Sequence, residues 1–293
     1  MIIAVRIFSE FLKKRLIRKT KATQDVVIKP IEDTNTLTEQ KNNNINIMDW
    51  STLKPINTSL IEAVDFPVEH YFPMEYKKTQ IVLHHTVSNP DSVIGDIDHW
   101  LSNDSRIATC IIVDSKGIAH QCFSSKYWGH HLGIKSTWLQ KNGYSDWSTR
   151  NIELNRNSIA IEIDNWGGLI LGDGTDKVIN NKVINTIKGE YYNAYGNIVK
   201  NVDVIEYPNG FRGYKYYQKY TKAQIKTVGE LILLWHIKYG IPLDYHEEMF
   251  DISKEAISGT PAIWCHASFR EDKGDCAPQP DLIDMLKELK NIH

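Results

Sequence analysis

The sequence has no long apolar run, few cysteines and little net charge. None of its 293 residues belongs to an apolar stretch near the roughly 20 residues that cross a bilayer, and candidates such as 231–235 are far too short. Four cysteines are too few for a disulfide scaffold, and they fit free thiols in a reducing compartment or one metal ligand among them. A formal net charge of -2 argues against a general nucleic-acid binder. The remaining composition, 42% hydrophobic and 24% charged, is globular and excludes a wholly disordered chain.

Positive charge is concentrated at the amino terminus. Residues 1–22 carry seven Lys or Arg and a single acid, and their apolar residues recur at near-helical spacing. This pattern fits a basic amphipathic helix in peripheral contact with a membrane, or a solvated basic leader. It does not fit a signal peptide, because Arg6 interrupts the apolar run and the charges follow that run. The Asn-rich stretch 32–46 indicates a linker. We therefore expect a leader and linker over 1–50 and the main domain over 51–293, its fold beginning between Trp50 and Tyr71.

Apolar periodicity in the main domain predicts alternating strands and helices. Short apolar runs indicate strands, and spacing near 3.6 residues with capping signals indicates helices. The expected strands are 79–84, 107–113, 118–123 and 158–163, and the expected helices are 93–101, 281–290 and one that starts after Thr221 and ends near Gly240. This alternation is typical of an α/β domain with a central sheet.

Residues 167–220 interrupt the alternation and are rich in Gly, Asn and Tyr. An insertion of this size inside a compact domain usually carries function or forms its own hairpins. Its tyrosines either pack the insertion onto the body of the domain or extend a groove for sugar rings, whose apolar faces pack on aromatic side chains.

Two segments far apart in the chain offer reactive side chains. His84 and His85 end the first expected strand, where alternation points them to opposite faces of the sheet. Near the other end of the chain, His266, Asp275 and Cys276 lie within eleven residues. Zinc accepts all three donor types, and a catalytic zinc keeps three protein ligands. His266 with Asp275 or Cys276 would supply two ligands and His84 the third, although the same residues also fit an ordinary surface loop.

Five short motifs follow one another along the main domain. They are Ile-Val-Leu-His-His-Thr at 81–86, a hairpin at 107–123, Trp-Gly-His-His-Leu-Gly at 128–133, Asn-Ser-Ile-Ala-Ile-Glu at 157–162, and the helix from Thr221 to Gly240 with Ile241-Pro242 behind it. Together they resemble the zinc-dependent N-acetylmuramoyl-L-alanine amidases of the type-2 amidase and peptidoglycan-recognition superfamily. The resemblance covers roughly residues 75–290 apart from the insertion. It implies a central mixed β-sheet flanked by helices, with a zinc site in a surface cleft.

The resemblance also implies the metal ligands. His84 and His266 match the two histidine ligands of the family's zinc. The third ligand stays open between two neighbours. Residues 273–278 fit the family pattern Lys-x-Asp-x-x-Pro, which favours Asp275, whereas the affinity of zinc for thiolate favours Cys276.

The same comparison implies the proton-transfer groups. Many members carry a Tyr at the position of Thr109, and members without it use a Glu at the position of Glu162 and a Lys at that of Lys273. Glu162 is thereby expected to act as the general base and Lys273 to stabilise the oxyanion. The alternative for Glu162 is a structural role, in a salt bridge at the end of a strand.

The other reactive residues are expected either to contact the substrate or to lie in the core. Trp128, His131 and Thr86 are expected to contact the substrate, because they lie on segments that would line the groove. Cys110 and Cys122 lie on paired strands but not directly opposite by turn counting, so they are expected to be core thiols without a disulfide.

Several functions are compatible with the resemblance. The first is hydrolysis of the amide between N-acetylmuramic acid and L-alanine of peptidoglycan, by an endolysin- or autolysin-like enzyme made in the cytoplasm without a recognisable signal peptide and acting on the wall after release. The insertion favours this function. The alternatives are a cytosolic amidase that recycles anhydro-muropeptides, a non-catalytic peptidoglycan-recognition module, which the missing tyrosine at Thr109 supports, and a zinc hydrolase of another amide. In each case we expect a monomer whose partner is not nucleic acid.

Overall fold

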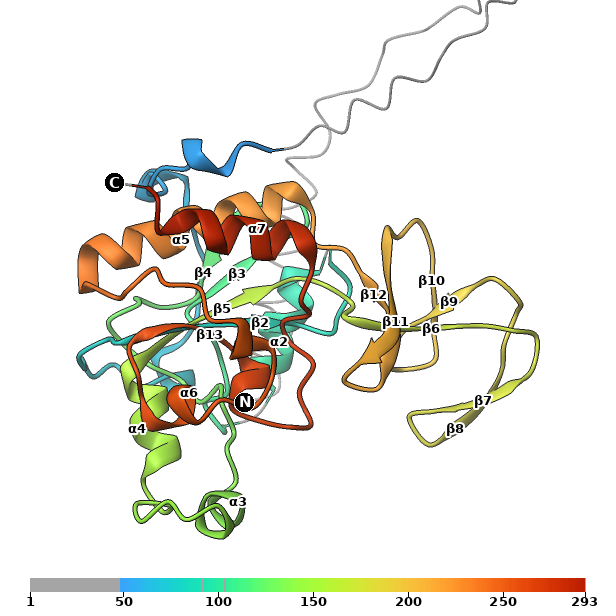
Figure 1. The fold of residues 1–293 in the computed structure, drawn as a ribbon, viewed down its shortest axis with the longest axis horizontal. Coiled ribbons are helices and arrows are strands. Elements are labelled where there is room, and N and C mark those ends of the chain that lie inside the picture. Colours follow the sequence, from blue (N-terminus) through green and yellow to red (C-terminus); the bar gives the residue numbers. More distant parts are fainter. Residues whose placement is uncertain (1–47, 91, 103, 293) are drawn as a thin grey trace, which may run out of the picture. The chain divides into compact units, whose positions relative to one another are not determined.

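The computed structural model describes residues 48–90, 92–102 and 104–292, and a six-stranded sheet with the order β1-β4-β3-β5-β2-β13 lies at the centre of this part (Figure 1). The strands are β1 (Glu62–Ala63), β2 (Gln80–His85), β3 (Ile111–Val113), β4 (Ala119–Gln121), β5 (Ser158–Ile163) and β13 (Ala262–Cys265). The sheet is mixed, because β4 runs antiparallel to β3 while the other pairs are parallel. The predicted α/β class with a central mixed sheet is confirmed.

The strands β2 and β5 form the buried middle of this sheet, which explains their nearly unbroken apolar sequences. Their parallel register pairs His84 with Glu162 and His85 with Ile163. Paired residues of neighbouring strands project to the same face, so His84 and Glu162 share one face and His85 projects to the other. The expected strands 79–84 and 158–163 are confirmed to within a residue.

Helices flank the sheet, and α5 and α7 lie against each other along one side of it (Figure 1). The α-helices are α2 (Val93–Leu101), α3 (Ser136–Lys141), α4 (Arg150–Asn157), α5 (Lys222–Tyr239), α6 (Lys254–Ser258) and α7 (Pro280–Leu289). The 3-10 helices are η1 (Trp50–Thr52), η2 (Thr58–Leu60), η3 (Val68–His70), η4 (Glu247–Phe250) and η5 (His266–Ser268). A capping box at Thr221 starts α5, and Gly240, with a left-handed φ of 68°, ends it, as the sequence predicts. Within the described residues, no helix is long and apolar enough to span a membrane.

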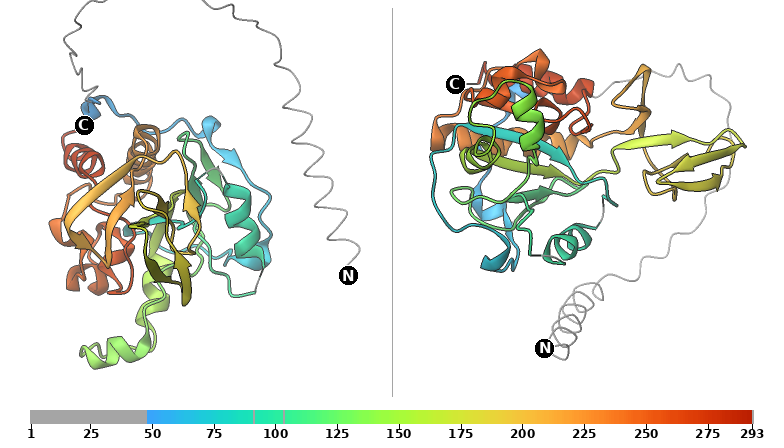
Figure 2. Two further views of the ribbon diagram at one scale, coloured as in Figure 1. Left: turned by 90° about the vertical axis from the view of Figure 1, so that its right-hand side faces the viewer. Right: turned by 90° about the horizontal axis from the view of Figure 1, so that it is seen from below.

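The insertion forms its own β-structure beside the central sheet (Figure 2). Its strands are β6 (Gly168–Leu171), β7 (Asp176–Ile179), β8 (Lys182–Asn185), β9 (Tyr191–Tyr192), β10 (Ile198–Val199), β11 (Val204–Phe211) and β12 (Tyr214–Gln218). Five of them pair in the order β10-β9-β6-β12-β11, and β7 and β8 form a separate hairpin. Tyr192 and Tyr217 are buried, and the ring of Tyr214 lies where a Cβ on Gly168 would be. These tyrosines pack the insertion, whereas Tyr195 is 50% exposed.

The hairpin of β3 and β4 is shorter than its apolar runs suggest. The expectation that Cys110 and Cys122 do not lie directly opposite each other is wrong. Its register pairs Ile111 with Gln121, and the backbone N–H of Cys122 donates to the carbonyl of Cys110 at 2.9 Å, which continues that register. The two cysteines therefore lie across from each other, because the turn between the strands is symmetric about residue 116. Both are buried free thiols, as predicted.

The described residues belong to one compact unit, Ile47–His293. Trp50 and Leu53 already lie in its core, at the start of the interval in which the fold was expected to begin. The leader and linker predicted over 1–50, and the membrane contact predicted for 1–22, lie outside the described residues apart from 48–50.

Candidate metal centre

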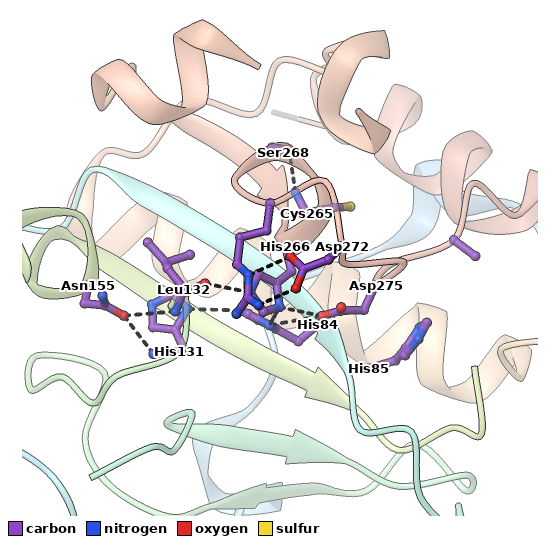
Figure 3. A network of polar contacts seen from close by, with 12 residues as sticks. His84, His85, His131, Leu132, Asn155, Cys265, His266, Ser268, Asp272 and Asp275 are labelled. Carbon is purple, nitrogen blue, oxygen red and sulfur yellow. Dashed lines mark hydrogen bonds and ion pairs between the residues drawn. The ribbon is translucent and has the colours of Figure 1, made fainter. Parts of the chain in front are cut away.

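Two histidines and an aspartate converge at the carboxyl end of the central sheet (Figure 3). His84 lies at the end of β2, His266 directly follows β13, and Asp275 lies on the loop that comes next. His84 Nδ1 is 3.0 Å from His266 Nδ1 and 3.2 Å from Asp275 Oδ2, and His266 Nδ1 is 2.9 Å from the same oxygen. All three side chains are at most 8% exposed. The fold thus brings His84 together with two residues that lie 182 and 191 positions further along the chain.

The hydrogen-bond partner of Nε2 fixes the tautomer of His266. Nε2 lies 2.9 Å from the backbone carbonyl of Leu132, which can only accept a hydrogen bond. Nε2 therefore carries the proton in the neutral ring, and Nδ1 presents a bare lone pair toward His84 and Asp275.

A chain of three hydrogen bonds fixes the tautomer of His84. The Ser158 hydroxyl donates to the Leu154 carbonyl at 2.6 Å, so its oxygen is left to accept from His131 Nε2 at 2.8 Å. With its proton on Nε2, His131 presents a bare Nδ1, which accepts from His84 Nε2 at 3.0 Å. His84 therefore also carries its proton on Nε2 and presents a bare Nδ1 at the cluster.

A cation placed between these three bare donors would satisfy all of them. Zinc ligands at 2.0–2.1 Å in tetrahedral geometry stand about 3.3 Å apart, and the three donor separations here are 2.9, 3.0 and 3.2 Å. Two imidazole nitrogens and one carboxylate oxygen are a donor set that zinc accepts, with a fourth position left for water or substrate. The residues present fit a zinc ion.

Electrostatics keeps these donors in the states that a metal requires. Burial, and then the neighbouring His266, lower the pKa of His84 to about 4, so the ring is neutral at pH 7. Burial raises the pKa of Asp275, but the two imidazoles beside it, His266 before His84, outweigh burial and hold this pKa well below its ordinary value. Asp275 is therefore a carboxylate.

Cys276 lies next to Asp275 in sequence but is not among the residues that the fold brings to the metal-binding group. Its thiol is fully buried, and it interacts with Cys265 and with the Tyr220 hydroxyl. Burial raises the pKa of this thiol well above its ordinary value, which disfavours the thiolate that zinc would bind. Geometry and electrostatics therefore favour Asp275 over Cys276 as the third ligand.

Glu162 lies on the face of the sheet that carries His84, as its register with that residue requires. Its Oε2 is buried and has no hydrogen-bond partner among the described residues. Burial, followed by the negative charge of Asp275, raises the pKa of Glu162 well above its ordinary value, and the positive charge of Lys273 acts in the opposite direction. A buried carboxyl with an unsatisfied oxygen and a raised pKa has the properties of a general base or acid.

The residues expected to contact substrate are engaged in internal contacts. Trp128 is 4% exposed, and its ring stacks on Phe72 with centroids 3.9 Å apart. The Thr86 hydroxyl donates to Asp164 Oδ1 at 3.1 Å. His131 is partly exposed and holds the position between His84 and Ser158 described above. Their contact with substrate stays a prediction.

Two residues that support the site escaped the sequence interpretation. Asn155 Oδ1 accepts from the backbone N–H groups of His131 and Leu132, at 2.7 and 3.1 Å. Ser158 accepts from the ring of His131. Ser158 belongs to the motif at 157–162 and Asn155 lies two residues before that motif, so the available signal was their position in or next to a motif used only for the resemblance.

An α/β sheet whose strand ends present two oriented imidazoles, a carboxylate and a buried glutamate is typical of the metal-dependent hydrolase class. A family model described as N-acetylmuramoyl-L-alanine amidase matches residues 75–278. The chain therefore belongs to the N-acetylmuramoyl-L-alanine amidase family and is an amidase. No curated protein matches the chain.

Three solved structures are similar to the chain at low identity. PlyL is 13% identical with a TM-score of 0.40, and the alignment covers 78% of this chain and 96% of PlyL. A selenomethionine derivative of AmpD is 12% identical with a TM-score of 0.37, covering 82% and 98%. The endolysin N-acetylmuramoyl-L-alanine amidase LysCS from Clostridium intestinale URNW is 12% identical with a TM-score of 0.37, covering 80% and 96%.

Proposed function

We propose that this chain is a zinc-dependent N-acetylmuramoyl-L-alanine amidase that hydrolyses the amide between N-acetylmuramic acid and L-alanine in the polymeric cell wall, in the manner of an endolysin or autolysin. The observation that supports this function best is the group of three bare donors from His84, His266 and Asp275, which lies on the same side of the sheet as the buried Glu162. We propose that the enzyme is made in the cytoplasm, acts on the wall after release, and works as a monomer. The recycling and recognition functions are outcomes of the test below.

Bound zinc would supply Lewis-acid polarisation of the substrate carbonyl and a lowered pKa for a coordinated water. His84, His266 and Asp275 would hold it. Glu162 takes the proton from the attacking water and passes a proton to the leaving amine of L-alanine, a role suited to a carboxyl whose pKa burial raises well above its ordinary value. Lys273, whose charge acts on both Glu162 and His84, stabilises the negative charge that develops on the carbonyl oxygen.

The test is digestion of purified peptidoglycan by zinc-loaded and chelator-treated protein, read by mass spectrometry. We expect zinc-dependent release of stem peptides that begin with L-alanine, without new reducing sugar ends. Soluble anhydro-muropeptides form a second arm, and faster cleavage there than in intact sacculi would favour the recycling function. Binding to sacculi with no cleavage in either arm would favour the recognition module.

A variant separates the role of Glu162 from metal binding. Glu162→Gln removes the base and keeps the size of the side chain, so we expect activity to fall by about 10²–10⁴-fold, with the bound zinc unchanged by elemental analysis. Glu153→Gln, at an exposed carboxylate on α4, is the matched control and should change neither. Activity of Glu162→Gln close to that of wild type would refute the assignment of the base.

A further inference from the structure

The tip of one hairpin of the insertion reaches the loop that carries Asp275. Strands β11 and β12 are joined by Arg212 and Gly213, with Phe211 paired to Tyr214 across the turn. The backbone φ is 45° at Arg212 and 87° at Gly213. A two-residue hairpin turn requires this left-handed geometry at both positions, which Gly, Asn and Asp adopt most readily. An arginine held in such a conformation points to a role for its side chain.

The guanidinium of Arg212 joins two separate backbone positions of the metal-ligand loop. Nη1 donates to the carbonyl of Glu271 at 2.9 Å, and Nη2 donates to the carbonyl of Ala267 at 3.4 Å. Ala267 directly follows the ligand His266, and Glu271 lies four residues before Asp275. The side chain of Arg212 is 16% exposed, its bond to Ala267 is partly buried, and its bond to Glu271 lies at an exposed position. One planar donor group thus holds the loop between the two ligands at its start and near its middle.

A packing contact joins the same two segments. A Cβ on Gly274 would lie 3.0 Å from the Tyr217 hydroxyl oxygen and 3.3 Å from Arg212 Cβ. Tyr217 is 1% exposed, and its hydroxyl donates to the carbonyl of Phe211 at 2.9 Å, which fixes its position at the base of the hairpin. The insertion therefore lies directly against the residue that precedes Asp275.

We propose that Arg212 is a positioning residue for the metal centre, through which the insertion holds the loop 267–275 in the conformation that presents His266 and Asp275 together. This inference rests on the proposed zinc dependence. Without Arg212 the loop samples other conformations, and zinc must order it on binding, which weakens the affinity for zinc. A lysine does not replace it, because a single ammonium group on a flexible stem lacks the rigid fork that reaches both carbonyls.

The remaining contact of Arg212 provides a control. Nη2 also donates to Asp251 Oδ1 at 2.7 Å, but the Asp251 side chain is 82% exposed. An exposed ion pair of this kind contributes little, so Asp251→Asn should leave zinc affinity unchanged. A second control lies on the same hairpin, where Lys215 pairs with Glu206 at 2.9 Å and both side chains are about half exposed. Lys215→Ala removes a cation from the hairpin without touching the loop.

The test compares zinc affinity, by competition with a chromogenic chelator, in wild type, Arg212→Ala, Arg212→Lys and the two controls. We expect Arg212→Ala to bind zinc about 10–100-fold more weakly, as is usual when a group that orients metal ligands is removed. Arg212→Lys should recover little of this loss, and both controls should match wild type. On peptidoglycan fragments, kcat should fall with KM nearly unchanged, because the loop carries Asp275 and Lys273.

Amide hydrogen exchange of residues 266–276 in the zinc-free protein gives a readout that needs neither metal nor activity. Exchange should be faster in Arg212→Ala than in wild type, and unchanged in Lys215→Ala. If Arg212→Ala does not fold, the same two measurements on the milder Arg212→Lys decide the question. Zinc affinity and loop exchange equal to wild type in a folded Arg212 variant would overturn the inference, as would a lower melting temperature with no change in zinc affinity. Absence of zinc binding by wild type would instead refute the proposed function.

Discussion

Each face of β2 carries one buried histidine, and the two histidines make different contacts. His84 and His85 are both buried, and burial is the main cause that lowers the pKa of each to about 4. His84 Nδ1 faces two further metal-binding donors, and His85 lies apart from them (Figure 3). His85 Nδ1 lies 2.8 Å from the hydroxyl of Tyr220. Burial and titration therefore do not distinguish a ligand from a structural histidine. The distinction lies in whether the facing groups can donate a proton, as Tyr220 can, or present only lone pairs.

Two adjacent residues on the loop after β13 also differ in their contacts. Asp275 joins His84, while the next residue, Cys276, interacts with Tyr220, the partner of His85. The backbone N–H of Ala277 also donates to the Tyr220 hydroxyl, at 3.1 Å. One face of β2 thus meets a set of metal-binding donors, and the other meets a tyrosine that ties the strand to the loop.

The largest expected effect separates the adjacent histidines. His84→Ala should lose zinc and with it activity by more than about 10³-fold, because metal catalysis contributes several kcal/mol to the lowering of the barrier. His85→Gln should retain zinc and most activity, and any loss should appear as a lower melting temperature. Zinc content, melting temperature and turnover of both variants check this prediction. Full zinc occupancy in His84→Ala would exclude that residue as a ligand.

The adjacent pair on the loop gives the next effect. Asp275→Ala removes one ligand, and since structural zinc sites with four ligands bind with about 10–16 kcal/mol, or about 2.5–4 kcal/mol per ligand, the loss of one should weaken binding by at least about 70-fold. Cys276→Ala should keep wild-type zinc affinity and lower the free energy of unfolding by about 1–3 kcal/mol, as a buried truncation does. Calorimetric titration with zinc and urea unfolding measure the two quantities. The reverse pattern would make Cys276 the third ligand.

The smallest effect is expected at His131, whose ring hydrogen-bonds to His84 Nε2. His131→Phe keeps the bulk of the ring and removes the Nδ1 acceptor that fixes the His84 tautomer, so zinc affinity should fall about 10–100-fold. His131→Asn, whose Oδ1 can accept in place of Nδ1, should recover part of this loss. His130→Phe, at the neighbouring half-buried ring, is the control. A raised KM with wild-type zinc affinity in His131→Phe would support the predicted substrate contact instead.

Local signals predicted the elements that build the site. Apolar runs and capping residues located β2, β5, α2 and α5 closely, because strand alternation and the Thr221 capping box act over a few residues. Motif order predicted His84 and His266 as ligands and left the third ligand open between Asp275 and Cys276. The hairpin of β3 and β4 was predicted too long, because apolar residues that flank a strand are also buried by packing without pairing.

The sequence by itself determined which strands and helices form the domain, and it supplied the candidate residues for the chemistry, with the third metal ligand open between Asp275 and Cys276. Only the tertiary structure decided how those residues are held. The Leu154–Ser158–His131 chain behind His84, the packing of Trp128 on Phe72, and the reach of Arg212 to Ala267 and Glu271 are set by partners that segments distant in sequence bring together. A hydrogen bond depends on distances of a few tenths of an ångström, and such distances arise only when those segments are packed against one another.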